Sequence, residues 1–183
     1  MRYRSIAVLL FSLLIPSLGV AAVPRPVDDW SDTVFALARQ RSALIRAMVS
    51  ELESSNVIVH IESSRLLPLG VGGITRFVTS QGGYRYIRVT LSISLPPPDR
   101  VAILGHELQH ALELARAGVS DRAALRSLLQ ADGYTVRGED VYETRAALLV
   151  EREIREELRR PDIPDKHRIP TRSASRQAAL PDK

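Results

Sequence analysis

Hydrophobic residues recur at intervals of three and four between Asp28 and Leu52, which is the spacing of one face of an α-helix. The pattern predicts one amphipathic helix that Asp28 or Ser31 can cap. The next run, residues 57–61, is short and rich in β-branched residues, and it predicts a strand. Residues 67–73 contain one proline and three glycines, so we expect a loop there.

Two further strands are predicted at residues 74–80 and 84–93. Residues 81–83 between them are Gln-Gly-Gly, a link that is typical of a β-hairpin. Hydrophobic and polar residues alternate along the second strand, and successive side chains of a strand point to opposite faces. One face of the predicted sheet should therefore be buried and the other should face water.

Three more helices are predicted in the second half of the chain. The first covers residues 100–117 with Asp99 as its cap, and the second begins at Ser120 or Asp121. The third covers residues 139–159. Strands followed by a group of helices predict an α+β fold, in which an antiparallel β-hairpin packs on a helix.

The composition fits one globular domain, because the chain has 183 residues of which 45% are hydrophobic. It has no cysteine, which excludes a disulfide scaffold, a cysteine-ligated metal site and a thiol nucleophile. The net charge of +4 belongs to the two ends, and residues 23–160 carry 18 bases and 18 acids. We therefore expect no nucleic-acid binding through a basic face of the domain.

The first 22 residues have a basic start, an uncharged apolar stretch and small residues up to Ala22. This three-part pattern predicts a signal peptide cleaved near Ala22 and a secreted or periplasmic protein. An uncleaved anchor is the alternative, but the stretch is shorter than the roughly 20 residues of a spanning helix, so no stable membrane insertion is expected after cleavage. Residues 23–160 would form the domain, and residues 161–183 a disordered basic tail.

The chemically distinctive segment is His106-Glu107-Leu108-Gln109-His110, inside the predicted helix 100–117. Two histidines four residues apart project from one face of a helix, which suits two imidazoles binding one Zn²⁺. The glutamate between them can reach a water bound to such an ion. The alternative is a solvated polar helix face with no metal. The opposite side of this helix is apolar, which favours a histidine face that borders a cleft; it carries Leu104, Leu108, Ala111, Leu112 and Ala115.

A catalytic zinc site needs a third protein ligand. Glu143 is the preferred candidate, because it falls in the apolar stripe of the predicted helix 139–159, and a buried carboxylate is costly unless it is paired or bound to metal. The alternatives are a position in the first turn of that helix, where acids are favoured, or replacement by Glu139 or Asp140.

Other histidines are weaker candidates for the third ligand. A histidine six residues after His110 would serve, but Arg116 occupies that position. His60 lies in a predicted strand far upstream, and His167 lies in the predicted tail.

On these residues the chain resembles the zincin superfamily of zinc metallopeptidases, specifically its gluzincin branch. In that branch a second helix follows the His-Glu-x-x-His helix and supplies a glutamate that completes the metal site. The resemblance covers residues 74–158 and implies a small zincin-like domain with one zinc ion per chain. It implies His106, His110 and Glu143 as zinc ligands and Glu107 as the general base.

The resemblance also implies that the strand at residues 84–93 aligns a peptide substrate by β-addition. No histidine is evident for stabilising an oxyanion. Tyr142, Tyr134 and Arg145 are the candidates for that role, and Tyr142 is the preferred one.

One position departs from the gluzincin pattern. Many gluzincins carry an aspartate four residues after the third ligand, where it orients a ligating histidine, and here that position is Ala147. Loss of such support weakens metal affinity or activity. Glu113 or Asp140 could take its place.

The sequence thus favours a secreted zinc metallopeptidase that hydrolyses peptide or protein substrates with Glu107 as general base. Two alternatives remain, a non-proteolytic zinc-binding domain of the cell envelope and a metal-free interaction domain. The small domain and Ala147 motivate the first of them. No pattern in the sequence predicts the cleavage preference or the oligomeric state.

Overall fold

The computed structural model describes residues 24–131, 135–136 and 142–160. Within them the chain has the α+β fold that the sequence predicts. Its elements are, in chain order, β1 (Arg25–Pro26), α1 (Asp29–Arg41), α2 (Ala43–Glu53), β2 (Val57–Ser64), β3 (Gly73–Gln81), β4 (Tyr84–Ser92), α3 (Pro97–Arg116), α4 (Arg122–Ala131), β5 (Thr135–Val136), β6 (Tyr142–Glu143) and α5 (Arg145–Arg159).

The predicted signal peptide and tail lie outside the described residues. No helix in the described part of the chain is both long enough and apolar enough to cross a membrane.

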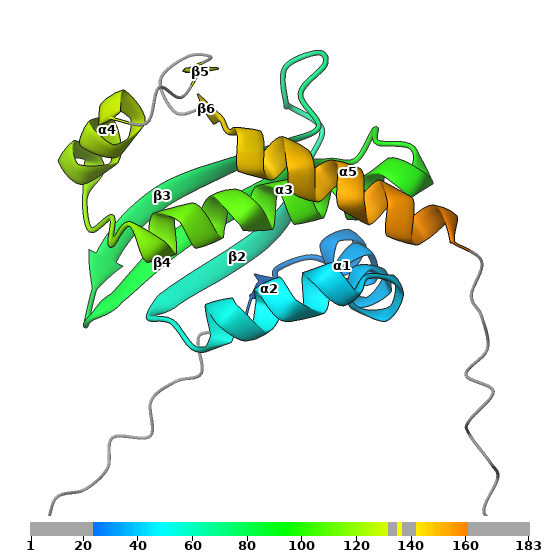
Figure 1. Cartoon of the computed structure of the whole chain (residues 1–183), viewed down its shortest axis with the longest axis horizontal. Helices are drawn as coiled ribbons and strands as arrows, with labels where there is room; N and C mark the ends of the chain where they lie inside the picture. Colours follow the sequence, from blue (N-terminus) through cyan, green and yellow to red (C-terminus); the bar gives the residue numbers. More distant parts are fainter. Residues whose placement is uncertain (1–23, 132–134, 137–141, 161–183) are drawn as a thin grey trace, which may run out of the picture.

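The main sheet has the strand order β1-β2-β4-β3 (Figure 1). The pairs β1–β2 and β2–β4 are parallel, and the pair β3–β4 is antiparallel. The predicted hairpin between β3 and β4 is confirmed, and Gly82 and Gly83 in its turn have φ of 60° and 81°. Glycine adopts such positive angles without steric cost, so this link suits a tight turn.

The expectation that the strand at residues 84–93 aligns a peptide by β-addition is wrong, because this strand has no free edge. β4 pairs on both sides, because β2 arrives parallel to it on the side opposite β3. The hairpin strand that lies at an edge of the sheet is therefore β3. The predicted alternation along β4 is confirmed for Ile87, Val89 and Leu91, which are buried against the helices, and for Arg88, which is exposed. Thr90 departs from it, because this residue of the predicted wet face is buried.

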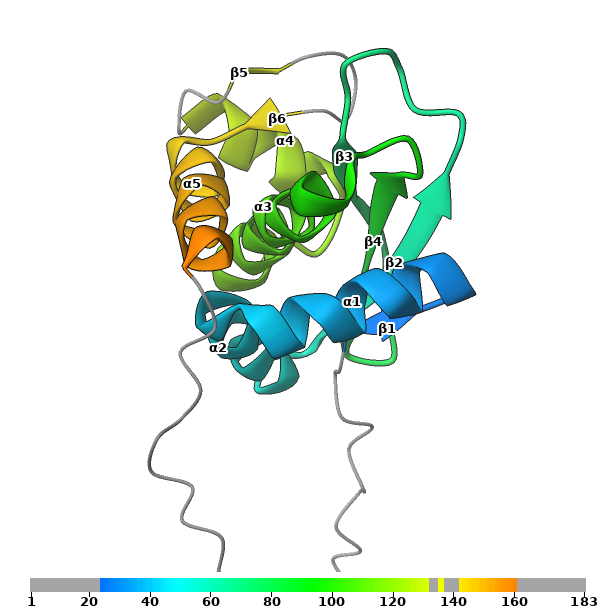
Figure 2. The ribbon, with the colours of Figure 1, turned by 90° about the vertical axis from the view of Figure 1, so that its right-hand side faces the viewer.

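The helix α3 lies between the sheet and α5, and α1 and α2 flank it (Figure 2). Every residue from Leu104 to Leu112 is consequently buried. Gly105 allows the close approach of α5, because a Cβ at this position would lie 2.0 Å from Ile154 Cδ1. The histidine face of α3 is therefore covered by protein rather than solvated.

The predicted helix from Asp28 to Leu52 is in fact two helices that break at Ser42. This residue is extended (φ −121°, ψ 122°), its hydroxyl accepts a hydrogen bond from Ile45 N (3.0 Å) and it donates one to Glu157. The hydrophobic spacing continues through the break because both helices pack on the same core. The predicted cap at Asp28 is confirmed, with Ser31 completing a capping box.

Two predicted helix starts are wrong. The helix α3 begins at Pro97 rather than at residue 100, and Asp99 lies in its first turn instead of capping it. Proline is tolerated there because the first N–H groups of a helix have no partner within it. The helix α5 begins only at Arg145, because the Thr144 hydroxyl caps it by accepting a hydrogen bond from Ala147 N (3.0 Å).

The late start of α5 changes the local context of Glu143. This residue lies in the extended two-residue strand β6 and not in the apolar stripe of a helix. The alternatives Glu139 and Asp140 fall outside the described residues.

Candidate metal centre

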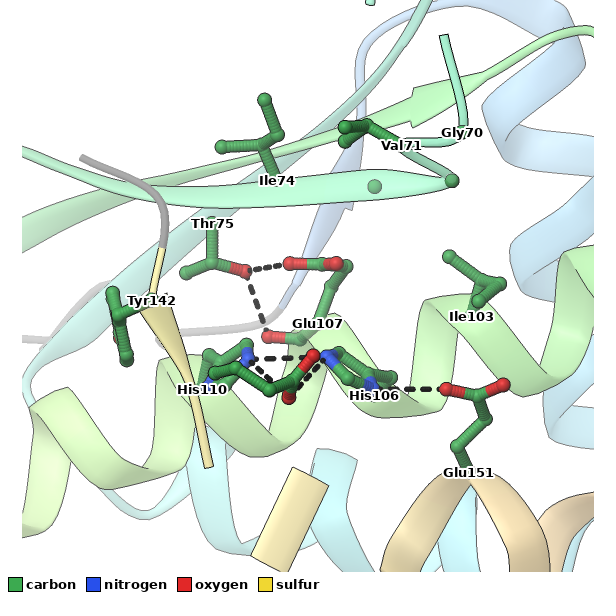
Figure 3. Close-up of a pocket in the computed structure, with 13 residues that line it drawn as sticks. Gly70, Val71, Ile74, Thr75, Ile103, His106, Glu107, His110, Tyr142 and Glu151 are labelled. Atoms are coloured by element: carbon green, nitrogen blue, oxygen red, sulfur yellow. Dashed lines mark hydrogen bonds and ion pairs between the residues drawn. The ribbon is translucent and has the colours of Figure 1, made fainter. Parts of the chain in front are cut away.

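The two histidines of α3 border a cavity of about 220 Å³ between α3, β3, β6 and α5 (Figure 3). The loop before β3 closes one side of it. The lining residues are Gly70, Val71, Gly72, Gly73, Ile74, Thr75, Ile103, His106, Glu107, His110, Tyr142, Glu143 and Glu151.

Three ligand atoms converge in this cavity. His106 Nε2 lies 3.1 Å from His110 Nε2, and Glu143 Oε1 lies 3.3 Å from the first and 4.0 Å from the second. Donors about 2.0–2.1 Å from a tetrahedral ion lie roughly 3.3 Å apart, so the spacing fits one metal ion. His106, His110 and Glu143 can therefore bind a metal ion together.

The other nitrogen of each imidazole is held by a carboxylate. His106 Nδ1 lies 3.0 Å from Glu151 Oε2, and His110 Nδ1 lies 3.0 Å from Glu113 Oε2. Each Nδ1 can thus donate its proton to a carboxylate, which leaves each Nε2 able to bind a cation.

The charge around the two imidazoles is strongly negative, because four glutamates approach them. Burial by itself lowers the pKa of His106, but hydrogen bonds to Glu143 and Glu151 and the charge of Glu107 outweigh it and raise this pKa to about 10. The fourth glutamate, Glu113, contacts His110. Carboxylates placed around two imidazoles in this way favour a bound cation.

The carboxylates that touch the imidazoles are held in the charged form. The hydrogen bond from His106 is the main reason why the pKa of Glu151 falls to about 2. For Glu143 and Glu113, burial raises the pKa, but hydrogen bonds and the charge of the neighbouring histidines lower it further. These groups therefore remain acceptors at neutral pH.

Glu107 differs from the other carboxylates because it is fully buried, and burial raises its pKa. Thr75 Oγ1 on β3 lies 2.8 Å from Glu107 Oε2 and 2.9 Å from the backbone oxygen of Glu107. A Cβ at Gly73 would lie 2.7 Å from Glu107 Cγ, so only glycine lets β3 pack this closely. A carboxylate with a raised pKa beside the metal donors is suited to accept and return a proton.

A short network positions the third donor. Thr144 Oγ1 donates to Glu113 Oε1 (2.8 Å), and Thr144 N donates to Glu143 Oε1 (3.0 Å). Glu113 lies three residues after His110 on α3 and therefore links one histidine to the junction of β6 and α5. Glu113 thus contacts His110 directly and reaches Glu143 through Thr144.

The support that Ala147 lacks comes from two other residues. Glu113 holds His110, as the sequence allowed, and Glu151 holds His106 from α5. Arg155 Nη2 donates to Glu151 Oε1 (2.8 Å), and Nη1 of the same side chain donates to Asp99. The carboxylate that orients a histidine therefore lies eight residues after Glu143, at Glu151, instead of four residues after it at Ala147. Glu143 itself precedes α5.

Several predicted residues lie elsewhere. His60 packs edge-to-face against Tyr86, with ring centroids 6.3 Å apart, and does not belong to the donor group. Arg145 is exposed and does not line the cavity. His167 and Tyr134 lie outside the described residues.

Tyr142 lines the cavity, and its ring lies 4.6 Å from that of His110 between centroids. The ring therefore packs against a metal-ligand candidate. A catalytic role for Tyr142 stays a prediction.

The sequence analysis missed Glu151, Thr75 and Gly73. Glu151 and Arg155 have the i, i+4 spacing of an ordinary surface ion pair, which gives no sign of a contact with another helix. The contacts of Thr75 and Gly73 depend on how β3 lies over α3, which no local pattern encodes.

Comparison of the chain with protein-family models, curated proteins and solved structures finds no match. Any functional inference must therefore come from the geometry and chemistry of this site.

Proposed function

We propose that the protein is a zinc metallopeptidase whose active site is the cavity between α3, β3, β6 and α5. The observation that carries the proposal is the convergence of His106 Nε2, His110 Nε2 and Glu143 Oε1 beside the buried carboxylate of Glu107. Two imidazoles and one carboxylate are a donor set of catalytic zinc sites, and three protein ligands leave a fourth position open. The gluzincin resemblance of the sequence agrees with this donor set.

A zinc ion held by these three residues would polarise a carbonyl group and lower the pKa of a water that it coordinates. Glu107 then acts as the general base, because it accepts a proton from the attacking water and returns it to the leaving amine. Its raised pKa suits both steps, and Thr75 keeps its carboxylate oriented. Glu113 and Glu151 orient the two imidazoles by accepting from their Nδ1 atoms.

A peptide substrate would bind as an added strand along β3, instead of along the strand at residues 84–93 that the resemblance suggests. Ser92 N donates to Gly72 O (2.9 Å), which marks a hydrogen-bonded pair at the start of the hairpin. Such pairs alternate with non-bonded ones in antiparallel sheets, so the backbone groups of Thr75 point away from β4. An extended peptide can pair with them directly above Glu107.

The test is the substitution Glu107→Gln, assayed with zinc-loaded protein on denatured casein. The amide keeps the shape of the side chain but cannot accept the proton, so hydrolysis should fall by about 10²–10⁴-fold while zinc content stays the same. Glu153→Gln, an exposed glutamate on α5, is the matched control and should retain activity. Undiminished hydrolysis by the Glu107→Gln protein would refute the assignment.

A non-proteolytic zinc-binding domain is the second candidate. The cavity volume of about 220 Å³ supports it, because pockets for small ligands usually measure about 300–1,000 Å³. Ala147 does not favour this candidate, because Glu113 and Glu151 orient the two histidines in place of an aspartate at position 147. Retention of one zinc per chain without cleavage of casein or of a broad peptide mixture would favour this candidate.

We further propose that the protein acts outside the cytoplasm. The basic start and uncharged apolar stretch before Ala22 support this placement. Sequencing the N-terminus of the protein recovered from its native compartment tests it, and a mature chain that still begins at Met1 would contradict it.

A further inference from the structure

The outer face of the sheet carries a row of basic residues that crosses all four strands. Arg25 pairs with His60, His60 pairs with Arg88, and Arg88 pairs with Arg76. Their side chains point away from α3, because the residues that alternate with them on β2 and β4 are buried against the helices. Figure 2 shows the helices on the opposite side of the sheet.

Arg88 and Arg76 are directly opposed like charges, which destabilise a sheet. Glu62 partly compensates for this repulsion, because its carboxylate lies 3.7 Å from Arg88. Within the described part of the chain, no ion pair joins Arg76 to a carboxylate. At the sheet edge the row therefore ends with the exposed guanidinium group of Arg76, which has no counter-charge among the residues that the structure describes.

Arg76 lies next to the candidate active site along the chain. Thr75 points inward, where its hydroxyl contacts Glu107. The following side chain, Arg76, points to the outer face of the same edge strand. A peptide strand added to β3 would place one residue beside Thr75 and the next residue beside Arg76, on alternate faces.

We propose that Arg76 makes the site selective for extended peptides with an acidic residue on the outer face, directly beside the residue that lies over Glu107. This inference rests on the proposed peptidase function and specifies its substrate class. An acidic side chain at this position continues the cross-strand row with the opposite charge, and a basic one extends the repulsion between Arg88 and Arg76.

Binding is measured by fluorescence anisotropy with the zinc-loaded Glu107→Gln protein, which cannot consume its ligand. The probes are two fluorescein-labelled decapeptides, one of alternating Glu and Thr and one of alternating Lys and Thr. An alternating peptide presents all its charges on one face of a strand. The acidic probe should bind about three- to tenfold more tightly than the basic probe.

Substitutions at Arg76 test whether this side chain causes the preference for the acidic probe. Added to the same protein, Arg76→Gln should abolish the preference and Arg76→Glu should reverse it. Arg159→Glu makes the same change in net charge at the far end of α5 and should keep the acidic preference. Equal affinity of the two probes, or a preference that persists in Arg76→Glu, would overturn the inference.

Cleavage of denatured casein by the zinc-loaded wild-type protein separates this inference from the proposed function. Cleavage sites with an acidic residue enriched at one fixed position, lost in Arg76→Gln, support both. Cleavage without such enrichment overturns the selectivity and leaves the peptidase function. Absence of cleavage together with Arg76-dependent binding of the acidic probe overturns the peptidase function and leaves the selectivity of β3.

Discussion

His106 and His110 lie one turn apart on α3, yet different parts of the molecule hold them. Glu113, which holds His110, belongs to the same helix, three residues further on. Glu151, which holds His106, comes from α5 and depends on how the two helices pack. One imidazole is thus oriented by local sequence and the other by tertiary structure.

The two contacts should therefore differ in how sensitive they are to changes in helix packing. The link between His110 and Glu113 joins two residues of α3, and Thr144 supports it from the start of α5. The link between His106 and Glu151 requires the close contact of Gly105 with Ile154. Changes at the α3–α5 contact should therefore affect His106 first.

Gly105→Ala should affect both stability and zinc binding, because it disturbs the contact between α3 and α5. The added methyl group would overlap Ile154 Cδ1, and forcing atoms into a packed core destabilises a protein by about 1–3 kcal/mol or more. Zinc affinity should fall as well, because α5 carries Glu151 away from His106. Thermal unfolding and competitive zinc titration measure the two effects.

Ile154→Ala provides the control for this clash. Alone it leaves a cavity and should destabilise the fold by about 2–5 kcal/mol. Combined with Gly105→Ala, it removes the atom that the new methyl group would hit. The double variant should therefore be more stable than the sum of the single effects predicts. Strict additivity would show that the clash is not the cause.

A second prediction compares the two carboxylates that hold the imidazoles. Replacing such a group lowers metal affinity by about 10–100-fold. Glu113→Gln should lie near the upper end, because Glu113 holds His110 and also, through Thr144, the position of Glu143. Glu151→Gln affects only His106 and should lie near the lower end. Zinc affinities of the two variants, obtained by chelator competition, test this order.

Arg155→Met addresses the same pair of contacts, because Glu151 is the carboxylate through which Arg155 reaches His106, while its contact with Asp99 lies at the start of α3. It should lower zinc affinity in the wild-type background and leave it unchanged in the Glu151→Gln background. An equal effect of Arg155→Met in both backgrounds would show that it reaches the metal by another route.

The smallest effect is expected far from both imidazoles, at Asp28. Burial raises the pKa of this group, but hydrogen bonds from Ser31 and Ser63 outweigh it and lower the pKa below its usual 3.8. Asp28→Ala should reduce the free energy of unfolding by about 1 kcal/mol at pH 7 through loss of the helix cap. Zinc affinity should not change.

The pH dependence of the Asp28 effect follows from the lowered pKa. A group whose pKa is lower in the folded state stabilises the protein above its unfolded pKa and loses that contribution as the pH falls through the folded value. The stability difference between wild type and Asp28→Ala should thus be constant near neutral pH and shrink below about pH 3.8. A difference that grows on acidification would contradict this assignment.

The features that the sequence predicts are those set by local spacing along the chain. The pentad from His106 to His110 has helical spacing, so its placement on one face of α3 follows from local periodicity alone. The β3–β4 hairpin is predicted for the same reason, since its turn residues and alternation are local. Glu143 lies with the two histidines in a group that could hold a metal ion, but its helical context is wrongly predicted, because it lies in β6 and not in a helix.

The remaining features could not be predicted, because they depend on contacts between distant segments. Ser42 breaks a continuous hydrophobic pattern, and its contact with Glu157 spans 115 residues of sequence. The identity of the edge strand depends on β2 joining β4 on the side opposite β3. Glu151 reaches His106 only through the packing of two helices.

X-ray absorption at the zinc edge tests the central claim most directly. For the wild-type protein loaded with one zinc per chain, we expect two imidazole nitrogens and at least one oxygen at about 2.0–2.1 Å from the ion. In Glu143→Ala the imidazole contribution should remain, and the zinc affinity should fall. Fewer than two imidazoles around the ion, or a spectrum and affinity unchanged in Glu143→Ala, would contradict the claim that His106, His110 and Glu143 form the metal site.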